Sequence, residues 1–196
     1  MDLDESMKRL QELERAREEL LKLVREMKIN ATKAIASIHA GQMEESKEYL
    51  SKALDVLQKV ETFKRYPEIY YSLTHDAMQE LVEALAFHSA VLGEFSFSVP
   101  AEVEPSALVT GLADLVGELR RYALSKLIEG DFEKAERLIA LMEGIYGKLI
   151  EFTSLPDKLV PGLRHKLDVA RAGIERTKSD YIAAKVARLN ESLGGN

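Results

Sequence analysis

Apolar residues recur every three or four positions along most of the chain, and this spacing is the feature that most limits how it can fold. Near the N-terminus, Leu10, Leu13, Leu20 and Val24 follow this spacing, with charged residues between them. The spacing places apolar side chains on one face of an α-helix. The alternation of apolar and polar residues that indicates a strand appears nowhere in the sequence. We therefore expect an all-α protein.

Glycine, proline and capping residues divide the chain into six or seven expected helices. Pro67 and Pro105 suit the first turn of a helix, where a missing N–H group is tolerated. Gly130 suits a left-handed helix end, and Asp131 suits the N-cap of the next helix. The least helical stretch is SFSVPAEVEPS, residues 96–106. The main expected helices are residues 4–39, 43–64, 67–93, 105–130, 131–154 and about 161–189.

No long linker separates these helices, so we expect one domain over residues 1–196, with loose termini at residues 1–3 and 191–196. The first helix would be about 50 Å long at a rise of 1.5 Å per residue, which exceeds the core of one subunit of this size. Part of its apolar face is therefore expected to meet another subunit, and the alternative is a solvated arm.

The composition excludes several classes of protein. The sequence has no cysteine, which rules out disulfides, thiolate metal sites and a cysteine nucleophile. No apolar run is long enough to span a bilayer, and the opening MDLDESMKRL lacks the apolar core of a signal peptide. We expect a cytoplasmic protein without a membrane partner.

The stretch from Tyr66 to Leu119 contains no lysine and no arginine, although the whole chain has 27 such residues. At the frequency of the whole chain, this stretch would carry roughly seven. Exposed helices usually pair acids with bases three or four residues away. Because these acids have no local partner, a divalent metal is the leading candidate to neutralise them. The acids are Glu68, Asp76, Glu80, Glu83, Glu94, Glu102, Glu104, Asp114 and Glu118.

Two pairs of these acids have helical spacing. Glu80 and Glu83 are three residues apart and Asp114 and Glu118 are four apart, so the members of each pair are neighbours on a helix surface. Carboxylates of this kind suit Mg²⁺ or Mn²⁺, which activates water for phosphodiester hydrolysis. The alternative is an ordinary solvated acidic face. A di-iron site is disfavoured because neither helix carries a Glu-x-x-His pairing.

The face of Asp114 and Glu118 also carries small residues, among them Gly111 and Gly117. A glycine inside a helix is less favourable than alanine by roughly 1 kcal/mol. These two glycines therefore suggest that another helix or a substrate approaches the backbone closely. Arg121, almost one turn beyond Glu118, is placed to contact a phosphate group.

The histidines do not converge in the sequence, and each is expected to be structural or exposed rather than catalytic. His88 is the reserve candidate because it lies near the acidic pair. Spacings typical of a serine hydrolase, a P-loop, a dinucleotide site or a zinc site are absent. The four histidines are His39, His75, His88 and His165.

Three segments carry a family resemblance: FKRYPEIYYSLTHDAMQELVEALAFHSAVL, GLADLVGELRRYALSKLIEGDF and LRHKLDVARAGIERTKSDY. In order and spacing they resemble segments of the translin family, which comprises translin and its partner TRAX. The resemblance covers about residues 10–190, and GELRR followed by GDF is its most specific part.

The resemblance implies a seven-helix fold that assembles into a hollow homo-octamer and binds single-stranded RNA or DNA inside it. TRAX-like members are metal-dependent ribonucleases, and QELVEA and GLADLVGEL are similar to their acidic segments. The resemblance therefore implies an Mg²⁺- or Mn²⁺-dependent endoribonuclease. Its catalytic residues and metal ligands would be Glu80, Glu83, Asp114 and Glu118. Basic residues for RNA flank the acidic stretch, namely Lys64, Arg65, Arg120 and Arg121.

Several alternatives stay open. Asp76 has no counterpart in the family pattern and contributes indirectly at most. Arg121 either contacts phosphate or pairs with Asp168 or Glu118. The protein as a whole is either this ribonuclease, a translin-like binding protein without catalysis, or a helical scaffold for another protein.

Overall fold

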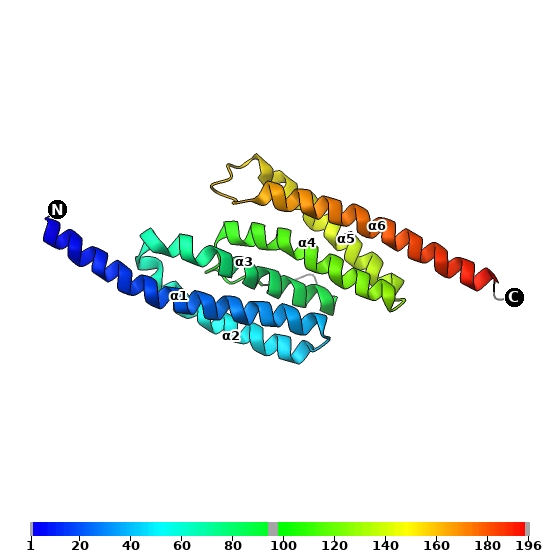
Figure 1. Cartoon of the computed structure of the whole chain (residues 1–196), viewed down its shortest axis with the longest axis horizontal. Helices are drawn as coiled ribbons and strands as arrows, with labels where there is room; N and C mark the ends of the chain where they lie inside the picture. Colours follow the sequence, from blue (N-terminus) through cyan, green and yellow to red (C-terminus); the bar gives the residue numbers. More distant parts are fainter. Residues whose placement is uncertain (1, 94–97, 195–196) are drawn as a thin grey trace. The chain divides into compact units, whose positions relative to one another are not determined.

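The computed structural model describes residues 2–93 and 98–194, and all regular structure within those ranges is helical (Figure 1). The chain divides into two compact units, Met1–Gly111 and Leu112–Asn196, which are described in turn. The α-helices are α1 (Leu3–His39), α2 (Met43–Glu61), α3 (Pro67–Leu92), α4 (Pro105–Ile128), α5 (Phe132–Leu149) and α6 (Leu163–Gly194), and the 3₁₀-helices are η1 (Thr62–Arg65) and η2 (Ile150–Ser154).

The first unit is organised around the long helix α1, which packs against both α2 and α3 (Figure 1). The fully buried side chains of Leu20, Met27 and Ile38 lie on the face of α1 that the sequence spacing predicts. Gly41 has a φ of 76° and turns the chain from α1 to α2, which only glycine does readily. The expected second helix, residues 43–64, is an α-helix as far as Glu61 and then continues as η1.

Helix α3 begins at Pro67 and ends before Gly93, as expected. The side of the helix that carries its acids is not simply exposed to water. Phe87 and Ala90 lie on the same side of the helix as Glu80 and Glu83, and both are buried. Leu92, the last residue of the helix, is 57% exposed. The helix is therefore buried over most of its circumference and does not present a purely acidic face to water.

The second unit contains α5 and α6 packed against each other (Figure 1). Asp131 is the N-cap of α5, because its Oδ1 accepts a hydrogen bond of 3.0 Å from the backbone N–H of Lys134. The expected helix 131–154 is α5 followed by η2. Helix α6 continues beyond Leu189, its expected end, to Gly194.

Two expectations concern the whole chain. Within the described ranges, none of the helices combines the length and the apolar character that crossing a bilayer requires. The single domain over residues 1–196 stays a prediction, although Leu3 and residues 191–194 belong to helices rather than to loose ends.

Candidate acidic site and cationic cavity

The first acidic pair lies on α3 in the first unit. Glu83 is only 8% exposed, so it does not belong to a solvated face. Glu80 is partly exposed, and its Oε1 accepts a hydrogen bond of 2.7 Å from the hydroxyl of Thr32 on α1. Glu83 is therefore the more buried acid of this pair, and a buried carboxylate is stable only with a cation or hydrogen-bond donors around it.

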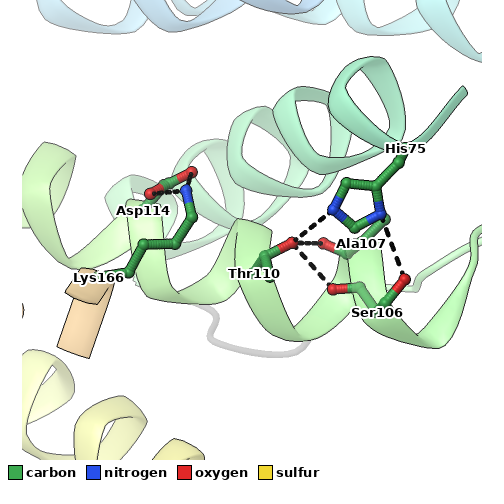
Figure 2. A network of polar contacts seen from close by, with 6 residues as sticks. All are labelled: His75, Ser106, Ala107, Thr110, Asp114 and Lys166. Carbon is green, nitrogen blue, oxygen red and sulfur yellow. Dashed lines mark hydrogen bonds and ion pairs between the residues drawn. The ribbon is translucent and has the colours of Figure 1, made fainter. Parts of the chain in front are cut away.

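The second acidic pair lies on the part of α4 that belongs to the second unit. The ammonium group of Lys166, on α6, lies 2.6 Å from both Oδ1 and Oδ2 of Asp114 (Figure 2). The side chains of Lys166 and Asp114 are 24% and 27% exposed. Glu118 lies one turn further along α4 and is partly exposed. The carboxylate of Asp114 therefore already holds a cation, supplied by the protein itself.

Some acids of the lysine-free stretch do have basic partners, which come from distant parts of the chain. Asp114 pairs with Lys166, and Glu68 accepts a hydrogen bond of 3.0 Å from the guanidinium of Arg9. Asp114 and Glu68 therefore have basic partners within the protein, and a divalent metal as the counterion of the acidic stretch stays a prediction.

A cavity of about 490 Å³ lies between α4 and α6 within the second unit, beside the Asp114–Lys166 pair. We call it the cationic cavity, because its charged lining consists of Arg120, Lys166 and Arg176 against the single acid Asp114, with His165 beside them. The rest of the lining consists of small apolar residues of both helices. Such a lining favours an anionic ligand.

Arg120 is held in this cavity in an unusual way. Its Nε atom is buried and has no hydrogen-bond partner among the described residues. Its side chain runs past Gly173 of α6, where an added Cβ atom would lie 3.3 Å from Cδ of Arg120. Gly173 therefore leaves the space that lets this arginine lie between the helices.

The other basic residues expected at the RNA have different surroundings. Lys64 forms an ion pair of 3.1 Å with Glu61. The guanidinium of Arg65 lies 5.0 Å from the centre of the Tyr66 ring. Arg121 is exposed. The expected alternative partner of Arg121, Asp168, instead lies 3.8 Å from Arg171.

His75 has a structural role. Its Nδ1 lies 3.2 Å from the hydroxyl of Ser106, and its Nε2 lies 3.5 Å from the hydroxyl of Thr110 (Figure 2). The hydroxyl of Thr110 also donates a hydrogen bond of 2.9 Å to the backbone carbonyl of Ser106. A neutral imidazole satisfies this arrangement by donating from Nε2 and accepting at Nδ1. These contacts join α3 to the first turns of α4.

The other histidines are more simply explained. The rings of His39 and Phe87 contact each other at a tilt of 45°, with their centres 4.9 Å apart. Burial lowers the pKa of His88, the reserve candidate, which favours its neutral form near pH 7. His165 lines the cationic cavity.

Next to this network, Glu104 is a titratable group that the sequence did not single out for a role. Its Oε1 accepts a hydrogen bond of 2.9 Å from the hydroxyl of Thr74. Burial raises the pKa of Glu104, and the hydrogen bond from Thr74 opposes that change. The hydroxyl of Tyr70 is fully buried and has no hydrogen-bond partner among the described residues. Burial raises the pKa of this phenol, and the nearby Glu104 adds to the effect.

The donor chemistry of the predicted ligands suits a hard divalent cation, since all four are carboxylates. Two of them, Glu80 and Glu83, belong to the first unit, and Asp114 and Glu118 belong to the second. Within either unit, the described residues bring together no group of three or more histidine, aspartate or glutamate side chains that would hold a metal. Asp76 is exposed on α3. The ligand set and its roles stay a prediction.

The sequence did not identify Lys166, His165 and Arg176 as possible functional residues. Lys166 and His165 lie in the LRHKLD segment, whose resemblance to the family was a usable signal. Neither the spacing nor the composition indicates that this segment faces Asp114, because the two positions are 52 residues apart.

The sequence and the fold match those of known proteins. The model of the translin family matches residues 96–179. The uncharacterized protein MJ0175 of Methanocaldococcus jannaschii is 31% identical over 172 residues, which are 85% of this chain and 75% of that protein.

Solved structures match over almost the whole chain. The structures of AfC3PO alone and of AfC3PO with duplex RNA are both 65% identical, with a TM-score of 0.94 over 97% of this chain and 100% of theirs. The apo structure of NeC3PO is 25% identical, with a TM-score of 0.81 over 93% of this chain and 97% of its own. The fold and the sequence lead to the same conclusion: this chain belongs to the translin family.

Proposed function

We propose that this protein binds RNA and cleaves it as an endoribonuclease that depends on Mg²⁺ or Mn²⁺. RNA binding is supported by the similarity to AfC3PO, whose structure has been solved with duplex RNA. This chain is 65% identical to it over nearly its full length. Catalysis is supported by the two acidic pairs at the positions that resemble those of TRAX. The burial of Glu83 adds to this support, because a carboxylate shielded from water binds a cation more strongly than an exposed one.

The four acids have distinct roles in the proposal. Glu80, Glu83 and Asp114 are ligands, and Glu118 is either a ligand or the base that accepts the proton of the attacking water. A bound divalent ion would lower the pKa of water and polarise the scissile phosphodiester. Hydrolysis by water leaves a 5′-phosphate and a 3′-hydroxyl. Thr32 contributes by fixing one oxygen of Glu80 and thereby the direction of the other.

The proposed assembly is a closed homo-octamer in the cytoplasm that encloses single-stranded RNA, or single-stranded DNA. Its support in this chain is an apolar stripe on the first turns of α1. Leu3, Met7 and Leu10 are 86%, 58% and 62% exposed, and their spacing places them on one side of the helix. A stripe of this kind suits contact with another copy. Lys64, Arg65, Arg120 and Arg121 are the proposed contacts to the phosphates of the strand.

The decisive experiment incubates the purified protein with end-labelled single-stranded and duplex RNA, in Mg²⁺ or in EDTA. We expect cleavage in Mg²⁺ only, with products that carry 5′-phosphates. The variants Glu83→Gln and Asp114→Asn should lose most of the activity and retain RNA binding. Glu133→Ala, which removes an exposed acid, is the matched control. Equal cleavage by Glu83→Gln, Asp114→Asn and the parent would show that the assigned acids are not catalytic.

One observation favours a second candidate, a binding protein without catalysis. The Asp114 carboxylate is already neutralised by Lys166, as a purely structural acid would be. Salt-sensitive RNA binding without cleavage in any divalent metal would support this candidate. The absence of both cleavage and binding would favour a scaffold for another protein.

A further inference from the structure

Asp114 and Lys166 both line the cationic cavity, so their ion pair forms part of its wall. Within the lining of the cavity, Lys166 forms an ion pair with the acid Asp114. The other charged groups of the lining, Arg120 and Arg176, form no ion pair within the part of the chain that the structure describes. The cavity therefore has a net positive charge and an unused capacity to donate hydrogen bonds.

The ion pair is tight but replaceable. Both contacts of the Lys166 ammonium are 2.6 Å long, and the two side chains keep about a quarter of their surface exposed. A partly exposed pair is worth less than a buried one, because water screens the charges. The stem of lysine is long and flexible, so its ammonium group can move to another anion without a change in the backbone.

We infer that Lys166 is an exchangeable counterion: it neutralises Asp114 while the cavity is empty and moves to a backbone phosphate when RNA enters the cationic cavity. The inference rests on the proposed function, in which Asp114 binds a divalent cation. Both oxygens of Asp114 are then more available to the metal when a strand is present than when the cavity is empty. Arg120 and Arg176 hold the same strand from the two helices that border the cavity.

This arrangement makes the binding of metal and of RNA mutually dependent. RNA favours the metal because it removes the competing ammonium group from Asp114. By thermodynamic reciprocity, the metal favours RNA to the same degree, because it releases Lys166 for the phosphate. Without RNA, Lys166 lowers the affinity of Asp114 for any cation.

The test compares Lys166→Met with the parent in two measurements that need no cleavage. The affinity for Mn²⁺ is measured by electron paramagnetic resonance without RNA, and the affinity for labelled oligouridine is measured in EDTA at several salt concentrations. We expect the variant to bind Mn²⁺ about fivefold more tightly, since a charge pair of this kind is worth about 1 kcal/mol. We expect it to bind oligouridine more weakly, with a salt dependence lower by about one phosphate contact.

The chain offers a matched control in Lys178→Met. Lys178, also on α6, forms an ion pair of the same length, 2.6 Å, with Glu143, and it does not line the cationic cavity. This variant should bind Mn²⁺ and oligouridine as the parent does. Lys166→Arg, which keeps the charge, should stay close to the parent in both measurements.

Each further outcome is decisive. If Asp114→Asn weakens Mn²⁺ binding but Lys166→Met leaves it unchanged, the inference is wrong and the proposed function stands. If Asp114→Asn leaves Mn²⁺ binding unchanged, Asp114 is not a ligand and both are wrong. Should Lys166→Met fail to fold, Arg176→Met serves instead, since Arg176 is exposed. It should weaken oligouridine binding without affecting Mn²⁺, and unchanged oligouridine binding would contradict a phosphate site in this cavity.

Discussion

Replacing Gly111 by alanine should destabilise the protein, although alanine is the better helix former. Gly111 lies on α4 where that helix meets α3 in the first unit. A Cβ atom at this position would lie 2.6 Å from the backbone oxygen of Gln79 and 3.0 Å from Cβ of Val82. Ordinary contacts of this kind begin at 3.4 Å. Because the nearest atom belongs to the backbone, α3 itself must shift to make room.

The size of the effect follows from two opposing terms. Alanine stabilises a helix interior by about 1 kcal/mol relative to glycine. Inserting a methyl group into a fully packed contact destabilises by about 1–3 kcal/mol, and the short distance to a backbone atom favours the upper end. The net loss is therefore about 2 kcal/mol, or a decrease of roughly 4–8 °C in Tm for a chain of this length.

The same substitution in open space should have the opposite sign. Gly144 on α5 has no atom within 4 Å of an added Cβ, so Gly144→Ala should stabilise by about 0.5–1 kcal/mol. Gly117→Ala on α4 tests the same point, because Gly117 also faces open space. Urea denaturation and thermal melting of the three variants measure the difference. If Gly111→Ala is as stable as Gly144→Ala, the close approach of α3 and α4 is wrong.

Three further predictions concern pH and capping. Burial raises the pKa of Glu104. The stability linked to its protonated form is therefore present below its ordinary pKa of 4.5 and is lost as the pH rises through the raised value. Glu104→Gln, which stays uncharged, should increase Tm at pH 7 and change it little at pH 4. Burial lowers the pKa of His88. The stability linked to its neutral form is therefore present above its ordinary pKa of 6.5 and is lost as the pH falls through the lowered value. Between pH 7 and pH 5, the Tm of His88→Gln should fall less than the Tm of the parent. Asp131→Ala removes the acceptor of the Lys134 N–H group and should reduce the free energy of unfolding by about 1 kcal/mol in urea.

Helix boundaries could be predicted where a local residue determines them. Gly93 and Gly130 have φ values of 86° and 78°, as expected of left-handed positions that end helices. Asp131 caps the next helix through its own side chain. The predicted end of α6 at about Leu189 was wrong. No proline or glycine follows Leu189 until Gly194, so the helix continues to that residue.

The environment of α3 could not be predicted from its periodicity. A helical wheel separates an apolar side from an acidic side, but it does not say how many neighbours a helix has. Phe87 is fully buried and Glu83 is 8% exposed, although both lie away from the main apolar side of α3. Leu92, at the end of the same helix, is exposed. These values depend on packing, which no local spacing encodes.

The charge pattern shows the same limit for the candidate site. Counting neighbours three or four residues away correctly finds acids without a local base, but the partners of Asp114 and Glu68 lie 52 and 59 residues away. The two pairs also differ in a way that the sequence does not show. The pair of Arg9 and Glu68 is largely exposed, so water screens it and its loss should matter little. Lys166 instead lines a cavity with two arginines, so an entering anion competes with Asp114 for its ammonium group. In the proposed function, this competition, rather than a deficit of bases nearby in the sequence, is the physical reason for assigning the exchangeable cation to Asp114.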